Sequence, residues 1–110
     1  MNSVSTREIG ENGLYACPCC GYATLQNVSA YEVCELCYWE DDGQDDPNES
    51  ENRNASNKVS LAEARVNFFS LGVCDVRHLD HVRPIESTDV NVRHYVFVDG
   101  CVTRRGSTKN

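Results

Sequence analysis

The chain has 110 residues, seven of them cysteine, and carries a formal net charge of −7. Its mean hydropathy of −0.51 and the absence of a long apolar run exclude a transmembrane helix, so we expect no membrane partner. The excess of acidic residues disfavours binding to a phosphate backbone, which argues against nucleic acid as a partner. A chain of this length is expected to form one domain, whose small hydrophobic core gains stability from an additional staple.

The N-terminal residues lack the basic segment and the following apolar segment of a secretory signal. Their Gly and Asn residues predict a flexible leader over residues 1–13, and we expect the folded domain over residues 14–110. Without such a signal we expect a cytoplasmic protein, in which thiols stay reduced. An odd number of cysteines also fits poorly with a complete set of disulfides, so the cysteines indicate metal ligands and free thiols.

Four of the cysteines have the spacing of a single metal site. Cys17 and Cys20 enclose two residues, Cys34 and Cys37 enclose two, and thirteen residues separate the two pairs. Two residues between thiolates allow a tight turn to direct both sulfurs at one ion, and two such knuckles provide the tetrahedron that zinc accepts. Because the protein fills all four positions, the site is closed, as structural zinc sites are. We therefore predict one Zn²⁺ per chain.

The segment between the two pairs predicts a hairpin of the zinc-ribbon type. We expect two short strands near residues 22–26 and 30–34, joined by a turn at Asn27 and Ser29. Gly21 follows the second cysteine of the first pair and can adopt the positive φ that often occurs at this point of a knuckle.

The three remaining cysteines are not needed by a four-thiolate site. Cys19 occupies the variable position of the first knuckle, where it is either a reactive or alternate-ligand thiol or a small residue packed beside the site. Cys74 and Cys101 are each isolated in a segment whose pattern is structural, which favours a packing role for both.

Residues 40–58 predict a polar loop that is rich in acidic side chains. A calcium loop of the EF-hand type fails here, because with Gly43 as its central glycine the first ligand position is Tyr38. The loop is then either a solvated linker or an anionic surface for a cationic partner. Trp39, beside it, is a core residue over the zinc site or an interface anchor. The candidate partner-binding residues are Trp39, Glu40, Asp41, Asp42, Asp45 and Asp46.

Residues 60–71 predict the main helix. Ser60 is placed to cap it, Glu63 completes a capping box, and Gly72 is suited to end it. The apolar positions on one face are Leu61, Ala64, Phe68 and Leu71.

A short second helix is expected from about Asp75 to the residues before Pro84. Its apolar side is formed by Val76, Leu79 and Val82. On this segment His78 and His81 are spaced like metal ligands, but Cys74 is the only further candidate ligand nearby, so we do not expect a second metal site. The third histidine, His94, is expected on the surface.

The C-terminal segment predicts a β-hairpin. Strands are expected near residues 92–98 and 101–104, because Val and aromatic residues are enriched there and Asp99–Gly100 suits a two-residue turn. Together the predicted elements describe a small α+β fold with a zinc-ribbon-like N-terminal half.

The order of these motifs resembles the cysteine-rich CPCC family of small bacterial proteins. The similar segments are "CPCCGY" from Cys17 to Tyr22, Tyr31–Glu32, Cys34 to Cys37, Trp39 to Gly43, the helix that begins after Ser60, and Val82–Pro84. The resemblance covers residues 14–86, so the hairpin over residues 90–104 is expected to be an addition. The resemblance implies zinc binding but no particular activity.

We therefore expect a non-enzymatic, zinc-binding module that contacts a basic protein partner and has no small-molecule substrate. The sequence has no Ser–His–Asp pattern, glycine-rich phosphate loop or activated nucleophile. The most specific form of this hypothesis is that the module inhibits a cationic bacterial toxin such as a nuclease, as immunity and antitoxin proteins do. The physical reason is that an acidic protein can cover a basic groove. Two alternatives are a redox or metal sensor that uses Cys19 beside the zinc thiolates, and a nucleic-acid-binding zinc ribbon, which the charge disfavours.

Overall fold

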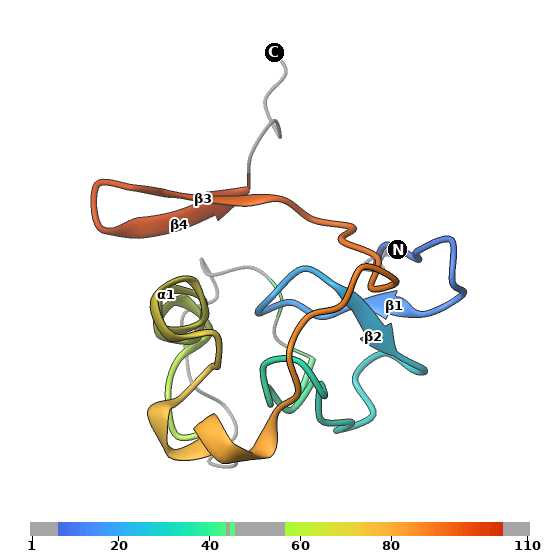
Figure 1. The fold of residues 1–110 in the computed structure, drawn as a ribbon, viewed down its shortest axis with the longest axis horizontal. Helices are drawn as coiled ribbons and strands as arrows, with labels where there is room; N and C mark the ends of the chain where they lie inside the picture. The colour runs from blue at the N-terminus through green and yellow to red at the C-terminus, as the bar shows by residue number, and fades with distance from the viewer. Residues whose placement is uncertain (1–6, 44, 46–56, 105–110) are drawn as a thin grey trace.

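The computed structural model describes residues 7–43, 45 and 57–104. The elements in chain order are β1 (Tyr15–Ala16), β2 (Ala23–Leu25), the α-helix α1 (Leu61–Leu71), the 3-10 helix η2 (Val76–His81), β3 (Tyr95–Val98) and β4 (Cys101–Arg104) (Figure 1). Strands β1 and β2 form one antiparallel pair, and β3 and β4 form another. The predicted small α+β fold, with short hairpins and helices, is confirmed.

Residues 7–13, which we expected to belong to the leader, pack against the domain. The backbone N–H of Ala16 donates to the carbonyl oxygen of Glu8, and Ile9 forms a β-bridge with Tyr15. The side chain of Arg7 is buried, and its Nη1 donates to the carbonyl oxygen of Ala16 at 3.0 Å. A buried guanidinium needs fixed acceptors, so this part of the chain is held in place. Residues 1–6 of the expected leader lie outside the described residues.

The N-terminal hairpin differs from the predicted one. The strand expected near residues 22–26 is present as β2, but it pairs with β1, and the first cysteine knuckle is the turn between them. The strand expected near residues 30–34 is wrong. Ser29 and Tyr31 have φ angles of 60° and 62°, which an extended strand cannot contain.

Helix α1 begins and ends where the sequence predicts. The Ser60 Oγ accepts a hydrogen bond from the backbone N–H of Glu63 at 3.0 Å, and Gly72 ends the helix in the left-handed region at φ 84°. Its buried residues are Leu61, Ala64 and Arg65, with Phe68 half-buried. Leu71, predicted on the apolar face, is wrong as a core residue, because it lies in the last turn and is 48% exposed.

The short second helix is the 3-10 helix η2, capped by the Asp75 carboxylate, which accepts from the N–H of Arg77 at 3.1 Å. Its predicted apolar side does not pack, because Val76 and Leu79 are exposed. Backbone contacts at its two ends hold η2 instead. The N–H of Cys74 donates to the carbonyl oxygen of Cys37, and the N–H of Arg83 donates to that of Glu35.

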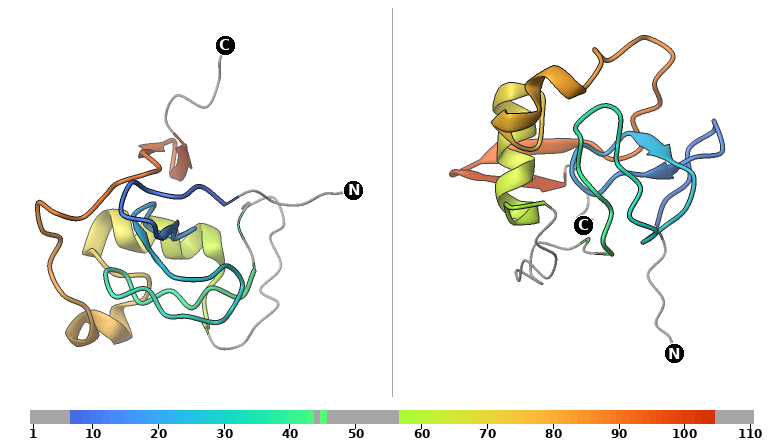
Figure 2. Two further views of the ribbon diagram at one scale, coloured as in Figure 1. Left: turned by 90° about the vertical axis from the view of Figure 1, so that its right-hand side faces the viewer. Right: turned by 90° about the horizontal axis from the view of Figure 1, so that it is seen from below.

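The C-terminal hairpin is confirmed, with Val98 opposite Cys101 and positive φ angles at Asp99 (52°) and Gly100 (81°). Two views show it lying beside α1 (Figure 2). Strand β3 begins at Tyr95 rather than near residue 92, because the preceding residues contact the first cysteine knuckle. The N–H groups of residues 92 and 93 both donate to the carbonyl oxygen of Gly21 at 2.9 Å.

The core is built around sulfur. One buried cluster joins both knuckles, β2 and the start of α1, and six of its eleven residues are cysteine. Its members are Cys17, Cys19, Cys20, Leu25, Cys34, Leu36, Cys37, Trp39, Leu61, Ala64 and Cys74. So few large apolar side chains offer limited hydrophobic stabilisation, which fits a domain that depends on a metal staple.

Within the described part of the chain, neither α1 nor η2 has the length and apolar composition that a bilayer-spanning helix needs.

Candidate metal centre

The two cysteine pairs form knuckles of the same build. In the first, the N–H of Gly21 donates to the carbonyl oxygen of Cys17 at 2.9 Å, and in the second, the N–H of Tyr38 donates to that of Cys34 at 2.8 Å. The residue after the second cysteine has a positive φ in both, 84° at Gly21 and 71° at Tyr38. The prediction for Gly21 is confirmed. A side chain there would also collide with the carbonyl oxygen of Arg93, so only glycine fits.

The four predicted ligand atoms come together in one buried group. The Sγ atoms of Cys17 and Cys37 are 3.6 Å apart, those of Cys20 and Cys34 are 3.8 Å apart, and all four lie within 4.8 Å of one another. Zinc–sulfur bonds of 2.3 Å place the corners of a tetrahedron about 3.8 Å apart. The arrangement therefore has the size of a four-thiolate site and can hold a metal ion.

Burial makes it costly to ionise these thiols unless a cation is bound. Burial raises the pKa of Cys17, Cys20 and Cys37, and for Cys20 and Cys37 the neighbouring thiols raise it further. Cys34 is the exception: burial opposes ionisation, but hydrogen bonds from the neighbouring thiols and Thr24 hold its pKa well below the usual value. Four ionised sulfurs at this spacing need a bound ion to balance their charge.

Thr24 contacts the candidate metal centre, which sequence reasoning missed. Its Oγ1 donates to the Sγ of Cys34 at 3.1 Å, and the backbone N–H of Leu36 lies 3.4 Å from the same sulfur. Such hydrogen bonds orient a ligand and stabilise its thiolate. The signal available in the sequence was a β-branched hydroxyl residue in the strand that follows the first knuckle.

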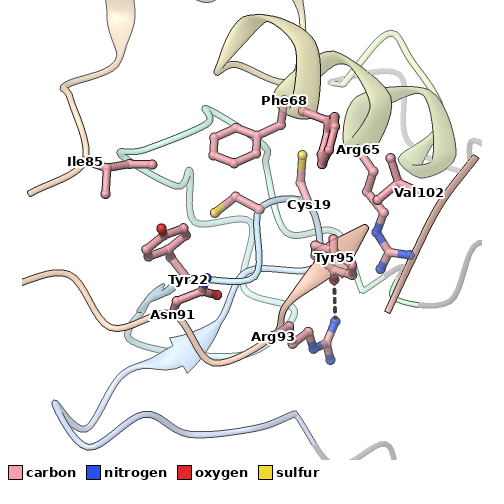
Figure 3. A pocket seen from close by; sticks show the side chains of 11 residues that line it. Cys19, Tyr22, Arg65, Phe68, Ile85, Asn91, Arg93, Tyr95 and Val102 are labelled. Carbon is pink, nitrogen blue, oxygen red and sulfur yellow. Dashed lines mark hydrogen bonds between the residues drawn. The ribbon is translucent and has the colours of Figure 1, made fainter. Parts of the chain in front are cut away.

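The three other cysteines lie outside the group of four. Cys19 is 1% exposed and points toward α1, where Phe68 and Arg65 lie (Figure 3). Its thiol is one of the neighbours that raise the pKa of Cys37, after burial, so it borders the site. Cys74 is also buried, whereas Cys101 is exposed, so the packing role predicted for Cys101 is wrong. The positions of Cys19 and Cys74 fit a packing role beside the site.

A pocket of about 230 Å³ separates the first knuckle from α1 and the C-terminal segment (Figure 3). Its walls include Cys19, Tyr22, Phe68, Arg65 and Arg93. Both arginines are already engaged. The Arg65 Nε donates to the carbonyl oxygen of Pro18 at 2.8 Å, and Arg93 holds both oxygens of the Asp45 carboxylate at 2.6 and 2.9 Å. The guanidinium groups therefore support the fold around the pocket.

Sequence reasoning also missed the three arginines around Asp45, which are Arg7, Arg65 and Arg93. Burial alone would lower the pKa of Arg93, but its hydrogen bonds to Asp45 and Glu8 raise it above the usual value. Arg65 also lies over the ring of Tyr95, 4.8 Å from its centroid. Arg65 could have been noticed, because it lies four residues after Leu61 on the face of α1 that carries the core.

Two of the predicted partner-binding residues, Trp39 and Asp41, face inward. Trp39 is 0% exposed, and its indole N–H has no acceptor among the described residues. Asp41 is also 0% exposed, and Arg7 donates to both of its carboxylate oxygens at 3.1 and 3.2 Å. Neither can contact a partner in this fold, because Trp39 is part of the core and the charge of Asp41 is paired.

The other acidic candidates differ among themselves. The Asp45 carboxylate is held by Arg93, as described above. Glu40 and Asp42 are half-buried, and the backbone of Glu40 forms two hydrogen bonds of 2.9 Å with the side chain of Asn57. Asp46 lies outside the described residues. The charges of Asp41 and Asp45 are therefore paired with arginines of the fold.

The chain was compared with known protein families, curated proteins and solved structures. A family model described as "Cysteine-rich CPCC" matches residues 15–89, which contain both knuckles, α1 and η2. Strands β3 and β4 follow the matched region. No curated protein and no solved structure matches the chain.

Proposed function

The chain belongs to the cysteine-rich CPCC family, and we propose that it is a non-enzymatic protein-binding module held together by one structural Zn²⁺. The observation that carries the proposal is the buried group formed by the Sγ atoms of Cys17, Cys20, Cys34 and Cys37. Four thiolates satisfy zinc completely and leave no position for a substrate, which supports a structural role for the ion. The seven free cysteines also fit a reducing compartment, such as the cytoplasm.

The partner that the charge distribution favours is a basic protein. Arg7, Arg65 and Arg93 are buried and face internal acceptors, so their charge is engaged inside the fold. Among the residues whose side chains are described, Lys58 and Arg77 are the exposed basic residues. Exposed acidic side chains are more numerous and include Glu11, Glu63, Asp80, Glu86 and Asp99. A surface with this excess attracts cationic proteins and accelerates their association.

The most specific form of the proposal is an inhibitor of a cationic bacterial toxin, such as a nuclease, that acts as an immunity or antitoxin protein. It is supported by the small size and the net charge of −7, which suit a protein that covers a basic groove. The sensor alternative is less well supported, because a thiol as deeply buried as that of Cys19 reacts slowly with oxidants.

Metal analysis tests the zinc site directly. The purified protein is expected to hold one Zn²⁺ per chain, and Cys34→Ser is expected to lose it during purification, because a site with three thiolates binds zinc more weakly than a closed site with four and no longer stabilises the fold as well. Cys101→Ser is the matched control, since Cys101 is exposed and does not belong to the group of four. Full zinc retention by Cys34→Ser, measured by atomic absorption, would contradict the assignment.

Capture with zinc-loaded protein as bait tests the partner. We expect the wild type to retain a basic protein from the source cell and to neutralise its toxicity at equimolar ratio. A four-fold variant is expected to associate more slowly, because it removes charges that attract a cationic partner; it carries Glu63→Gln, Asp80→Asn, Glu86→Gln and Asp99→Asn. Its association rate should also depend less on salt, because salt screens charges beyond about 8 Å at physiological ionic strength and fewer charges are left to screen.

Lys58→Gln is the control for this experiment, because it alters an exposed charge of the opposite sign. An association rate that is identical for the wild type and the four-fold variant at low salt would show that the exposed acidic residues do not guide the partner. A retained protein that is acidic and not toxic would contradict the inhibitor proposal as a whole.

A further inference from the structure

Two histidine side chains meet on η2. The Nδ1 atoms of His78 and His81 share a hydrogen bond of 3.2 Å, and their ring centroids are 5.4 Å apart. The pair spans a kink in η2, because His78 itself has non-helical dihedral angles (φ −106°, ψ 16°). The sequence shows the spacing, but an α-helix would offset the two rings, so the close approach of the nitrogens is a property of this fold.

The two rings lie on a fixed platform. Both pack on the ring of Tyr38, with centroid distances of 4.4 Å for His78 and 5.0 Å for His81. Tyr38 directly follows the last cysteine of the second knuckle. The backbone hydrogen bonds described above join both ends of η2 to this knuckle, and Arg83 adds an ion pair with Glu35 at 2.6 Å. The histidine pair is therefore held in place by the same segment that forms the metal centre.

We propose that His78 and His81 form a second metal site, which binds a divalent first-row transition-metal ion such as Zn²⁺ or Ni²⁺ through their Nδ1 atoms. Two imidazole nitrogens bound to a tetrahedral zinc at 2.0–2.1 Å lie about 3.3 Å apart, which is close to the spacing observed here. Imidazole is a preferred ligand of both ions.

The site differs from the cysteine centre in having open positions. Among the described residues, no third histidine, cysteine or carboxylate joins the pair to make a larger group of ligands. Water fills the remaining coordination positions of the bound ion, and such a site binds more weakly than a closed site with four protein ligands. His81 is exposed and His78 half-buried, so an ion reaches the pair from solvent.

The surroundings of His78 favour its neutral form. Burial lowers the pKa of His78, the neighbouring Arg77 lowers it further, and Asp75 opposes this effect. When a metal binds, the imidazole that donates the Nδ1–Nδ1 hydrogen bond carries its proton on Nε2 instead, and both Nδ1 atoms then offer a lone pair to the ion. The net charge of −7 adds a general attraction for cations.

The test is a titration of protein that already holds one Zn²⁺, in the Cys101→Ser background to remove the exposed thiol. The added probe is Ni²⁺, which does not oxidise thiols, and binding is measured by calorimetry. We expect about one further equivalent to bind, and at least tenfold weaker binding in His78→Gln and in His81→Gln. His94→Gln is the matched control, because His94 is the third histidine and is exposed.

Proton NMR locates the ion independently of affinity. Ni²⁺ is paramagnetic, so the ring signals of His78 and His81 should broaden at low metal ratios while those of His94 stay sharp. Retention of the first Zn²⁺ is measured in parallel with a chromophoric chelator, which excludes exchange at the cysteine centre. The proposal is overturned if the wild type takes up no further Ni²⁺, or if His94→Gln weakens uptake as much as the His78 and His81 variants.

Discussion

Three buried arginines connect parts of the chain that are distant in sequence. Arg7 precedes β1, Arg65 lies on α1 and Arg93 precedes β3, and all three meet the short segment that contains Asp41 and Asp45. Each guanidinium also has hydrogen-bond acceptors close by, which a buried charge requires. Ion pairs therefore hold together elements that the small sulfur-rich core does not reach.

Arg7→Met is predicted to cost about 3–5 kcal/mol in the free energy of unfolding, because it leaves the buried Asp41 carboxylate without its counter-charge. The double variant Arg7→Met, Asp41→Asn should recover part of this loss, since the amide carries no unpaired charge and keeps an acceptor for the N–H of either Ser29 or Gly43. Urea titration of the zinc-loaded proteins measures both. A loss below about 1 kcal/mol for Arg7→Met would show that the pair is not buried in solution.

The acidic residues after Trp39 show which features of single residues can be predicted from the sequence. A series of Asp and Glu predicts a solvated surface, because isolated carboxylates rarely lie inside a protein. Asp41 can be buried because Arg7, 34 residues away in the sequence, pairs with its charge. Asp45 is paired in the same way with Arg93, 48 residues away. No local pattern contains such pairs. The four metal ligands, by contrast, were predictable because their chemistry is set by a spacing of two residues.

At the scale of elements, the predictable features are those with local causes. The cap at Ser60, the stop at Gly72 and the Asp99–Gly100 turn each depend on residues within one turn, and each is found as predicted. The prediction of a strand near residues 30–34 was wrong because Ser29 and Tyr31 adopt positive φ angles. These angles could not be predicted from the two residue types. Strand β3 was predicted too long because residues 92 and 93 bind Gly21 from a distant segment.

Ser60→Ala is predicted to cost about 1 kcal/mol through the loss of the hydrogen bond to the N–H of Glu63. Ser70→Ala is the matched control, because Ser70 lies exposed in the same helix and alanine has the higher helix propensity. This control should leave stability unchanged or raise it slightly. Equal losses for the two variants in a denaturant titration would mean that the cap does not stabilise α1.

At the scale of the whole molecule, the metal centre and α1 share one core. Leu61 and Ala64, from the first turn of the helix, belong to the same buried cluster as the four ligands. The ends of η2 are bound to the second knuckle, and residues 92 and 93 are bound to the first. Every described element after the knuckles therefore contacts them directly or through the core, and zinc is expected to stabilise the whole described fold.

We therefore predict that removing zinc unfolds α1 together with the knuckles. During treatment with a strong chelator, the circular dichroism signal at 222 nm should fall with the same time course as zinc release, because metal binding energy is folding energy in such domains.

Acid is predicted to unfold the protein in the same way. Burial raises the pKa of Cys17, Cys20 and Cys37 and so favours their protonated forms. Protons then compete with zinc, so loading is complete at high pH and is lost as the pH falls. The helical signal should disappear over the same pH range and return when zinc is added at neutral pH. A metal-free protein that keeps its full helical signal would show that α1 folds on a core of its own.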